Sequence, residues 1–244
     1  MPETFQTVTL LMPVFNEDRW LEQIVRKAAG QPLPGGLRRQ FVIVDDGSTD
    51  HTPDVLRALP ALFPEETFVV LAKPANEGKG AALRDGWAKA TGDILLIQDA
   101  DLEYDPSDYP ALLQPILDDR ADAVFGSRLA GNARHRMPAW QRGGNAWLTA
   151  LCNRLSGMTL SDMECGYKVF TKAVYSKISI QSRDFGVEPE LALKTARLRL
   201  GDKPVRVVEV GVTYSGRDYA SGKKIRKLDA LKAVFQIFRF RFFS

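Results

Sequence analysis

Carboxylates at the end of an apolar segment are the first candidates for chemistry in this sequence. Asp99 and Asp101 are separated by one residue, and Asp99 comes two positions after the apolar run Ile94–Ile97. Glu103 follows two residues after this pair. Ionised carboxylates at this spacing repel one another unless a cation lies between them, and an open set of oxygen ligands suits Mg²⁺ or Mn²⁺ that also contacts a diphosphate. The alternative is a solvated turn, in which we expect Asp105 to take part.

Polar residues also follow two other apolar runs. Asn16 and Glu17 come shortly after the run Val8–Met12. The segment 45–48, with the sequence Asp-Asp-Gly-Ser, comes after Phe41–Val44. Helix capping explains each of these segments equally well when it is taken alone.

Two basic residues are candidates for binding phosphate. Lys79 lies between Gly78 and Gly80, and such glycines permit close approach of the backbone to an anion. The segment lacks the Gly-x-x-x-x-Gly-Lys-Ser/Thr pattern, so an ATPase is not predicted. Arg128 follows the apolar run 121–125, and a guanidinium binds phosphate through two parallel hydrogen bonds. A surface ion pair is the alternative for Arg128.

The apolar runs that carry these residues are predicted strands of one sheet. They alternate with segments of helical spacing, such as Trp20–Ala29 and Glu188–Arg199, which is typical of parallel strands covered on both faces. Right-handed crossovers bring the carboxyl ends to one edge, where open α/β sheets bind ligands. We therefore expect a Rossmann-like α/β fold with a mostly parallel sheet and helices on both faces. The predicted strands are 8–12, 41–44, 68–71, 94–97 and 121–125, with a later strand at 204–214.

After the fifth predicted strand the pattern changes. Residues 130–145 are rich in Gly, Arg and Pro and predict a mobile loop, and a helix is predicted around Trp147–Ser156. No internal repeat or low-complexity linker divides the chain. We expect one domain over residues 1–216. Residues 217–244 are expected to form a basic loop and a carboxyl-terminal amphipathic helix that packs on this domain or extends from it.

Composition limits the class of protein. The 244 residues are 45% hydrophobic and 26% charged, which excludes a disordered or collagen-like chain and suffices for a core. Cys152 and Cys165 form no C-x-x-C motif, so we expect free thiols in a reducing compartment. The amino-terminal residues show no secretory signal, and no apolar run has the length of a membrane helix. We therefore expect a cytoplasmic location.

The net charge of +3 hides an asymmetry between the two ends. Residues 217–244 contain eight basic and two acidic residues, whereas the first 216 contain 25 basic and 28 acidic ones. Apolar residues recur three and four apart from Leu228 to Phe242, which predicts an amphipathic helix. Positive charge and phenylalanine suit a surface of anionic lipid, to which the protein would bind peripherally; packing into the core is the alternative. Nucleic acid is not an expected partner, because no basic stripe with interleaved aromatics is present.

Six segments occur in the order seen in family 2 glycosyltransferases with the GT-A fold, and from Val8 to about Lys227 the chain resembles this family. The last of these segments, residues 162–170, resembles the D-x-x-x-G-[FY]-[KR] motif of the branch that contains the dolichol-phosphate mannosyltransferases and glucosyltransferases. The resemblance implies inverting, metal-dependent transfer of one sugar from a UDP- or GDP-linked donor to a polyprenyl phosphate. The segments are 13–17, 45–48, 76–80, 99–101, 126–128 and 162–170.

The resemblance also implies roles for individual residues. Mg²⁺ or Mn²⁺ would be bound by Asp99 and Asp101, with Glu103 as a further ligand where the mannosyltransferases often have Gln. Asp101 and Arg128 would act on the diphosphate. Asp162 would orient the acceptor or accept a proton, or else cap a turn. The nucleotide sugar would be held by Pro13, Phe15, Glu17, Val44, Asp46, Lys79, Asp99, Ala100, Asp101 and Arg217, together with Lys223 or Lys224.

Other functions remain as alternatives. A soluble acceptor would keep the enzyme class, but the basic apolar end of the chain argues against it. A silent nucleotide-sugar binding module would have no physical need for the repulsive pair Asp99 and Asp101. A nucleotidyltransferase would carry a Gly-rich basic segment after the first strand, where this chain has 13–17. Processive synthases carry a Q-x-x-R-W motif and membrane helices, and this sequence has neither.

Overall fold

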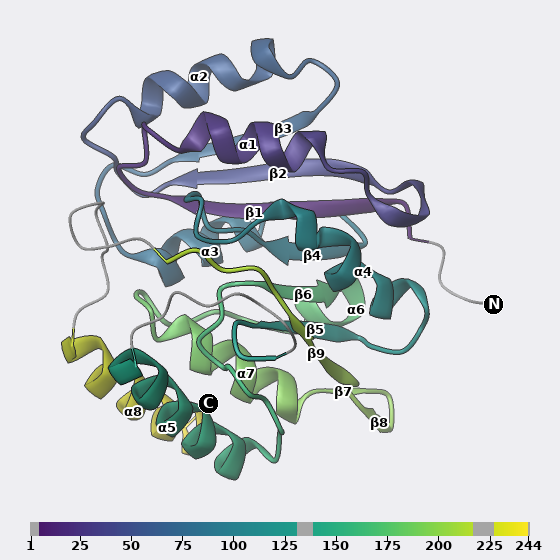
Figure 1. The fold of residues 1–244 in the computed structure, drawn as a ribbon, viewed down its shortest axis with the longest axis vertical. Helices are drawn as coiled ribbons and strands as arrows, with labels where there is room; N and C mark the ends of the chain where they lie inside the picture. Colours follow the sequence, from purple (N-terminus) through teal and green to yellow (C-terminus); the bar gives the residue numbers. More distant parts are fainter. Residues whose placement is uncertain (1–4, 131–138, 217–226, 244) are drawn as a thin grey trace.

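The computed structural model describes residues 5–130, 139–216 and 227–243. Its main sheet has seven strands in the order β3-β2-β1-β4-β6-β5-β9, which Figure 1 shows from the upper to the lower part of the view. The predicted mostly parallel α/β sheet is therefore confirmed. The strands are β1 (Thr7–Val14), β2 (Arg38–Asp45), β3 (Thr67–Ala72), β4 (Ile94–Ile97), β5 (Ala123–Ser127), β6 (Lys168–Thr171) and β9 (Val207–Gly211), and β7 (Arg199–Leu200) pairs with β8 (Lys203–Pro204) in a small separate sheet.

Helices cover both faces of the main sheet, as predicted. The helices α1, α2 and α4 contribute to one hydrophobic cluster, and α3 and α5 to α8 contribute to the other. The helices are α1 (Leu21–Gly30), α2 (Thr52–Leu62), α3 (Lys79–Trp87), α4 (Tyr109–Leu117), α5 (Ala139–Ser156), α6 (Lys172–Tyr175), α7 (Val187–Arg197) and α8 (Lys227–Phe242), with short 3-10 turns at Pro34–Gly36 and Pro106–Asp108.

Alternation along the strands separates the two clusters. In β1, Leu10 and Met12 pack with the first cluster, whereas Leu11 packs with the second. In β4, Leu96 packs with the first cluster and Leu95 with the second. Because successive side chains of a strand point to opposite faces, a continuous apolar run is what a sheet covered on both faces requires.

One strand of the sheet was not predicted. β6 lies between β4 and β5 and runs antiparallel to both. It has only four residues, and it begins with Lys168, which is wholly buried. A short run that contains a lysine does not predict a core strand, because the acidic partner that allows the lysine to be buried is not evident from the sequence. The predicted strand at 204–214 was too long, because β9 covers only 207–211.

The helix after the fifth strand begins earlier than predicted. α5 starts at Ala139, so the predicted loop at 130–145 was wrong for residues 139–145. Gly143 and Gly144 lower the helix propensity of this segment. However, Leu148 and Cys152, which lie one turn apart in α5, pack into the second hydrophobic cluster and stabilise the helix. Residues 131–138 of the predicted loop lie outside the described part of the chain.

The carboxyl-terminal helix α8 packs against α5 and α7, and Figure 1 shows α5 and α8 side by side at the lower left. Ala233, Ile237 and Phe240 are buried, while Phe235 and Phe242 are exposed. The helix is therefore amphipathic, with one face in the core and an aromatic face outside. The division of the chain at residue 216 stays a prediction.

Two expectations from composition can be compared with the described residues. No helix within them has both the length and the apolar character needed to cross a membrane. Cys152 and Cys165 are buried free thiols, as expected. Burial raises the pKa of each thiol to about 12, so neither is a reactive thiolate near neutral pH.

Candidate active site

The carboxyl ends of β1, β2, β4 and β5 meet at one edge of the sheet, because these strands run parallel to one another. β6 is antiparallel, so its amino end lies at this same edge. The segment 161–167, which precedes β6, is thereby placed beside the residues that follow the other strands. The structure thus brings together most of the segments that the sequence singled out.

Asp99 and Lys79 form the central ion pair of this edge. The Lys79 ammonium lies 2.7 Å from Oδ1 of Asp99 and 3.0 Å from Oε1 of Glu188. Burial alone would lower the pKa of Lys79, but these two carboxylates raise it well above its ordinary value. Lys79 is therefore a fixed positive charge beside the first carboxylate of the predicted metal pair.

The glycines around Lys79 serve internal packing. A Cβ on Gly78 would lie 2.4 Å from the carbonyl oxygen of Arg183, and one on Gly80 would lie 2.4 Å from that of Ser182. Gly78 also has a φ of 100°, which L side chains rarely adopt. The backbone of this loop is thus pressed against the segment that precedes α7.

Gly166 brings the backbone of the 161–167 segment against Asp99. A Cβ at this position would lie 2.4 Å from Oδ2 of Asp99, so no larger residue fits without a shift. The backbone N–H of Gly166 donates a hydrogen bond of 2.9 Å to the hydroxyl of Tyr104. The two oxygens of Asp99 are therefore located by Lys79 on one side and by Gly166 on the other.

Asp101 and Glu103 lie on the turn that follows β4. Oδ1 of Asp101 accepts a hydrogen bond of 3.0 Å from the backbone N–H of Glu103. The hydroxyl of Tyr214 donates to Oε2 of Glu103 at 2.8 Å. Both carboxylates are only partly buried, so they lie within reach of a ligand at this edge. As expected, Asp105 takes part in the turn, where it accepts the backbone N–H of Ser107.

Asp46 anchors the loop before α3. Its carboxylate accepts the backbone N–H groups of Glu77, at 3.1 Å, and Gly78, at 2.7 Å. The ammonium of Lys73 lies 3.0 Å from Oδ1 of Asp46. Asp46 therefore connects the carboxyl end of β2 to the loop that carries Lys79.

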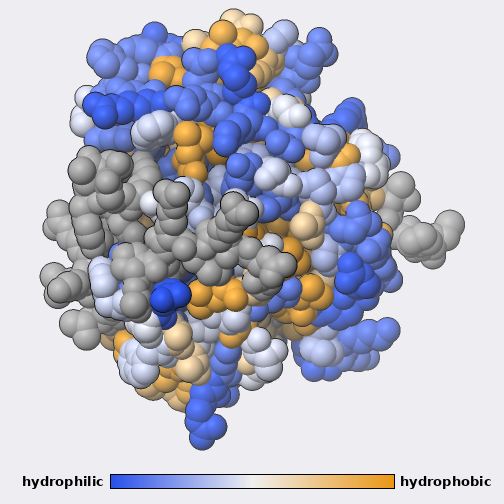
Figure 2. All heavy atoms as spheres, viewed as in Figure 1, coloured by the Kyte–Doolittle hydropathy of each residue, from blue (hydrophilic) through white to orange (hydrophobic). Residues whose placement is uncertain are grey.

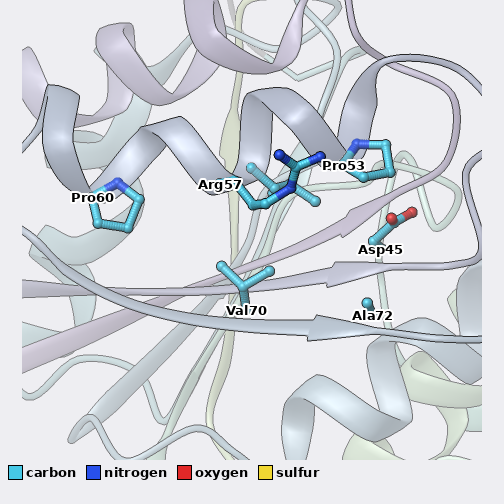
Figure 3. Close-up of a pocket in the computed structure, with 7 residues that line it drawn as sticks. Asp45, Pro53, Arg57, Pro60, Val70 and Ala72 are labelled. Atoms are coloured by element: carbon cyan, nitrogen blue, oxygen red, sulfur yellow. The ribbon is translucent and has the colours of Figure 1, made fainter.

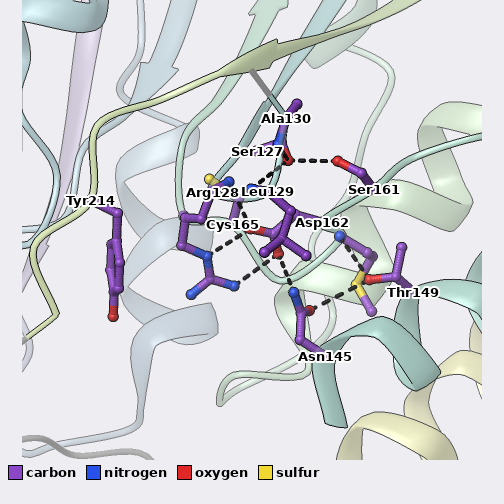
Figure 4. Close-up of polar contacts among 12 residues, drawn as sticks. Ser127, Arg128, Leu129, Ala130, Asn145, Thr149, Ser161, Asp162, Cys165 and Tyr214 are labelled. Atoms are coloured by element: carbon purple, nitrogen blue, oxygen red, sulfur yellow. Dashed lines mark hydrogen bonds and ion pairs between the residues drawn. The ribbon is translucent and has the colours of Figure 1, made fainter. Parts of the chain in front are cut away.

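Arg128 and Asp162 form a buried bidentate pair (Figure 4). The guanidinium donates to the carboxylate at 2.7 and 2.8 Å, and the backbone N–H of Arg128 donates at 2.9 Å. Asn145 of α5 adds a fourth bond at 2.7 Å. Burial raises the pKa of the Asp162 carboxyl, but the bonds from Arg128 outweigh burial and hold it below its ordinary value. The face of Tyr214 lies 5.2 Å from the guanidinium of Arg128.

Glu209 of β9 fixes the segment that carries Asp162. Its carboxylate accepts the backbone N–H groups of Ser161, at 2.8 Å, and Asp162, at 3.1 Å. The Ser161 hydroxyl lies 2.6 Å from that of Ser127, at the end of β5. These contacts connect the end of β5 and the middle of β9 to the 161–167 segment.

The residues predicted to hold the nucleoside have different exposures. Pro13 and Phe15 are partly exposed at the end of β1. Glu17 is 7% exposed, and its backbone N–H donates to the hydroxyl of Thr52. Val44 is wholly buried in the second hydrophobic cluster, and Ala100 is 3% exposed. Arg217, Lys223 and Lys224 lie outside the described residues.

The residues present fit a divalent ion that is shared with a substrate. No group of three or more His, Cys, Asp or Glu side chains within the described ranges forms a ready-made metal site. Asp99 and Asp101 supply hard carboxylate oxygens from one turn. Mg²⁺ is commonly bound by one or two carboxylates together with substrate phosphates, and this donor set has that form.

A separate groove lies between α2 and the edge strand β3 (Figure 3). It encloses about 400 Å³ and is lined mainly by apolar side chains, with Asp45 and Arg57 as its charged residues. Asp45 faces this groove, whereas Asp46 turns toward Lys73, because successive residues of an extended chain point to opposite faces. The groove is therefore distinct from the set around Asp99.

Three residues of the edge were missed from the sequence. Asn145 was assigned to a loop, Lys168 was quoted within a motif without a role, and Glu188 was noted only as a helix residue. A lysine next to Val169 and Phe170 is itself a signal, since a lysine is almost never buried without a partner. The identity of that partner, Glu188, depends on the tertiary fold.

The fold and the strand-end residues are those of the GT-A class of glycosyltransferases. The model described as "Glycosyl transferase family 2" matches residues 9–179. The chain therefore belongs to glycosyl transferase family 2, and the resemblance inferred from its motifs is confirmed.

Relatives in this family include polyprenyl-phosphate sugar transferases. The chain is 26% identical over 223 residues to undecaprenyl-phosphate 4-deoxy-4-formamido-L-arabinose transferase of Edwardsiella ictaluri, covering 91% of this chain and 64% of that protein. It is 26% identical over 219 residues to UDP-N-acetylglucosamine--dolichyl-phosphate N-acetylglucosaminyltransferase of Methanococcus voltae, covering 82% and 85%. The low-salt glycan biosynthesis hexosyltransferase Agl6 of Haloferax volcanii is 27% identical, with 87% and 48% covered. The chain thus spans less than two thirds of the first and third relatives.

Solved structures share the fold. Glucosyl-3-phosphoglycerate synthase from Mycobacterium tuberculosis in complex with UDP superposes with a TM-score of 0.70 at 20% identity, covering 97% of this chain and 80% of that one. The same enzyme with Mn²⁺, UDP-glucose and phosphoglyceric acid gives 0.68. At this identity the likeness establishes the GT-A fold.

Proposed function

We propose that the protein is an inverting, metal-dependent glycosyltransferase that moves one sugar from a UDP- or GDP-linked donor to a polyprenyl phosphate. The observation that carries this proposal is the convergence of Asp99, Asp101 and Arg128 with the 161–167 segment at one sheet edge of a family 2 chain. The names of two relatives, which act on undecaprenyl phosphate and dolichyl phosphate, support the acceptor class.

The donor would bind across the ends of β1, β2 and β4. Asp99 and Asp101 would hold Mg²⁺ or Mn²⁺ with the diphosphate, with Glu103 as a further candidate ligand. The ion would supply stabilisation of the negative charge that develops on the leaving nucleoside diphosphate. A structural neighbour that binds Mn²⁺ with UDP-glucose supports a divalent ion here.

Arg128 and Asp162 would act on the phosphate side of the site. A guanidinium carries five N–H groups, and two of those of Arg128 bond Asp162, so the group has others for a phosphate. Asp162 is a poor proton acceptor because its pKa is held low by Arg128. The role that we assign to Asp162 is to orient the side chain of Arg128. A phosphate acceptor is already an anion near neutral pH and needs no strong base.

A membrane surface would be contacted by α5 and α8. Five exposed aromatic side chains lie on these two packed helices, and Figure 2 shows hydrophobic residues at the surface in the lower part of the view. Arg239 and Arg241 of α8 add positive charge. Tryptophan, phenylalanine and arginine together suit a peripheral contact with anionic lipid, which we place at the cytoplasmic face. This aromatic surface consists of Trp140, Trp147, Phe235, Phe238 and Phe242.

The proposal is tested by a screen of nucleotide sugars with Mn²⁺ and a short polyprenyl phosphate. Release of the nucleoside diphosphate and formation of the glycolipid are followed together. Transfer to the lipid phosphate with one donor is the expected result. If nucleoside diphosphate is released but no glycolipid forms with any of the donors, the proposed acceptor is wrong.

A soluble acceptor is the second candidate, because the structural neighbours are glucosyl-3-phosphoglycerate synthases. Phosphoglyceric acid is therefore included in the screen as a competing acceptor. Faster transfer to it than to the polyprenyl phosphate would favour this candidate and would leave the aromatic surface without a role in the reaction.

A further inference from the structure

A chain of buried charges leads from Asp99 into the core. Glu188 of α7 lies 3.0 Å from the Lys79 ammonium through Oε1, and its other oxygen, Oε2, bonds the ammonium of Lys168. The exposed fractions of these side chains are 5% for Glu188, 13% for Lys79 and 0% for Lys168. Lys79 in turn contacts Oδ1 of Asp99 at 2.7 Å. One carboxylate therefore joins two lysines from two different elements.

Both lysines determine where Asp99 lies. Lys79 contacts Asp99 directly. Lys168 donates to the backbone carbonyl groups of Met163, at 3.2 Å, and Cys165, and so holds the segment whose Gly166 is pressed against the other oxygen of Asp99. Glu188 is the group that contacts both lysines.

We propose that Glu188 is a positioning residue that acts through Lys79 to set the geometry and the local charge of the Asp99 carboxylate, and thereby its affinity for a divalent cation. Lys79 is a built-in cation that competes for Asp99. Glu188 divides the charge of Lys79 between two carboxylates, and this leaves Asp99 available to a second cation. The inference rests on the proposed function only in taking Asp99 as a ligand of Mg²⁺ or Mn²⁺.

The test measures Mn²⁺ binding directly, by electron paramagnetic resonance of free Mn²⁺, with UDP and with GDP present in separate titrations. Glu188→Gln keeps the shape of the side chain but leaves Lys79 with Asp99 as its remaining carboxylate partner. We expect the dissociation constant for Mn²⁺ to rise by between roughly tenfold and a thousandfold, where the upper value corresponds to one full unpaired charge about 4 Å away at an effective dielectric constant of 20. A third titration without nucleotide tests Lys79→Gln, which removes the competing cation and should lower the dissociation constant for Mn²⁺ there.

A double-mutant cycle separates positioning from simple loss of charge or of folding. In the Lys79→Gln background, Glu188→Gln should change the Mn²⁺ constant by less than about twofold, because the route through Lys79 is gone. The variant Glu188→Gln/Lys168→Met keeps the buried charges balanced, so it protects the fold. This variant should still show weak Mn²⁺ binding.

Glu190→Gln is the matched control on the same helix. Glu190 is also wholly buried and forms an ion pair of 2.7 Å with Lys194, but its other bonds go to the backbone of Gln181 and Ser182. This variant should lower the melting temperature and leave the Mn²⁺ constant within twofold of the unmodified chain.

Two results overturn different claims. If the unmodified chain binds Mn²⁺ and Glu188→Gln binds it equally well, or if the effect of Glu188→Gln persists in full without Lys79, the positioning role is wrong and the proposed function stands. If the unmodified chain binds no Mn²⁺ with either nucleotide, the metal part of the proposed function fails, and the inference fails with it.

Discussion

Arg128 and Asp162 are 34 positions apart in the chain, yet three hydrogen bonds from one residue reach the carboxylate of the other. The carboxylate is wholly buried and the arginine side chain is 10% exposed. Removing one partner of such a pair leaves an uncompensated charge in the core, which is more costly than the loss of a surface pair.

Asp162→Asn should therefore destabilise the protein strongly. We expect the free energy of unfolding to fall by about 3–5 kcal/mol, the range for breaking a buried ion pair. Denaturant unfolding followed by circular dichroism measures this change. Asp118→Asn is the control, because Asp118 pairs with Arg120 at the surface, where the loss of one partner changes the free energy of unfolding little. Equal losses in the two variants would show that the buried pair is not a major source of stability.

Asp101→Ala should remove metal-dependent turnover while the fold survives. Asp101 is partly exposed at the end of β4, outside both hydrophobic clusters, so its loss leaves the core intact. We expect turnover to fall by roughly 100-fold or more, the usual effect of deleting one group that stabilises developing charge. Turnover and melting temperature are measured together.

Asp105→Ala is the control for this variant, since Asp105 lies in the same loop but bonds the backbone N–H of Ser107 and the ammonium of Lys27. It should lose some stability and keep its turnover. Full activity of Asp101→Ala, or of the unmodified enzyme in excess chelator, would contradict the metal site.

The exposed aromatic surface is predicted to bind anionic liposomes. Phe235 and Phe242 are 66% and 62% exposed, so replacing both with Ser should leave the melting temperature nearly unchanged. We expect liposome binding to weaken by about tenfold or more, because each phenylalanine loses apolar area that lipid would cover. Sedimentation with liposomes measures this. A shift as large with Leu62→Ser, an exposed residue of α2, would mean that the contact is not specific to this surface.

Deletion of the end of α8 is a poor test of the same idea. Ile237 and Phe240 are wholly buried, so removing residues 235–244 would open the core and unfold part of the protein. The two alternatives drawn from the sequence, core packing and lipid contact, therefore describe opposite faces of one helix. The lipid contact stays a prediction.

The strands and the edge that carries the site could be predicted because apolar runs and the polar residues after them are local patterns. The metal candidates Asp99 and Asp101 were found in this way. Glu188 was not, because its role depends on its ion pairs with Lys79 of α3 and Lys168 of β6, which no local pattern reveals. The antiparallel β6 was missed for a similar reason, since Lys168 is compatible with a core strand only once Glu188 is beside it.

Glu164 is a carboxyl group that the proposed mechanism does not use. Its Oε1 is buried without a hydrogen-bond partner in the described part of the chain. Burial, and then the negative charge of Glu188, raise its pKa from 4.5 to about 7, although Lys168 and Arg128 lower it and Asp162 adds a small increase. The folded state therefore holds this proton more tightly than the unfolded state.

The sign of the effect on stability follows from this difference. Below pH 4.5 the carboxyl is protonated in both states, and between pH 4.5 and about 7 only the folded state keeps the proton. Glu164 thus makes the protein lose stability as the pH rises through this window, and the loss is complete above about pH 7. Glu164→Gln should remove the loss and raise the melting temperature at pH 8 by several degrees, with little change at pH 4.5. Thermal unfolding of both proteins across the window measures it, and parallel curves at every pH would contradict a raised pKa for Glu164.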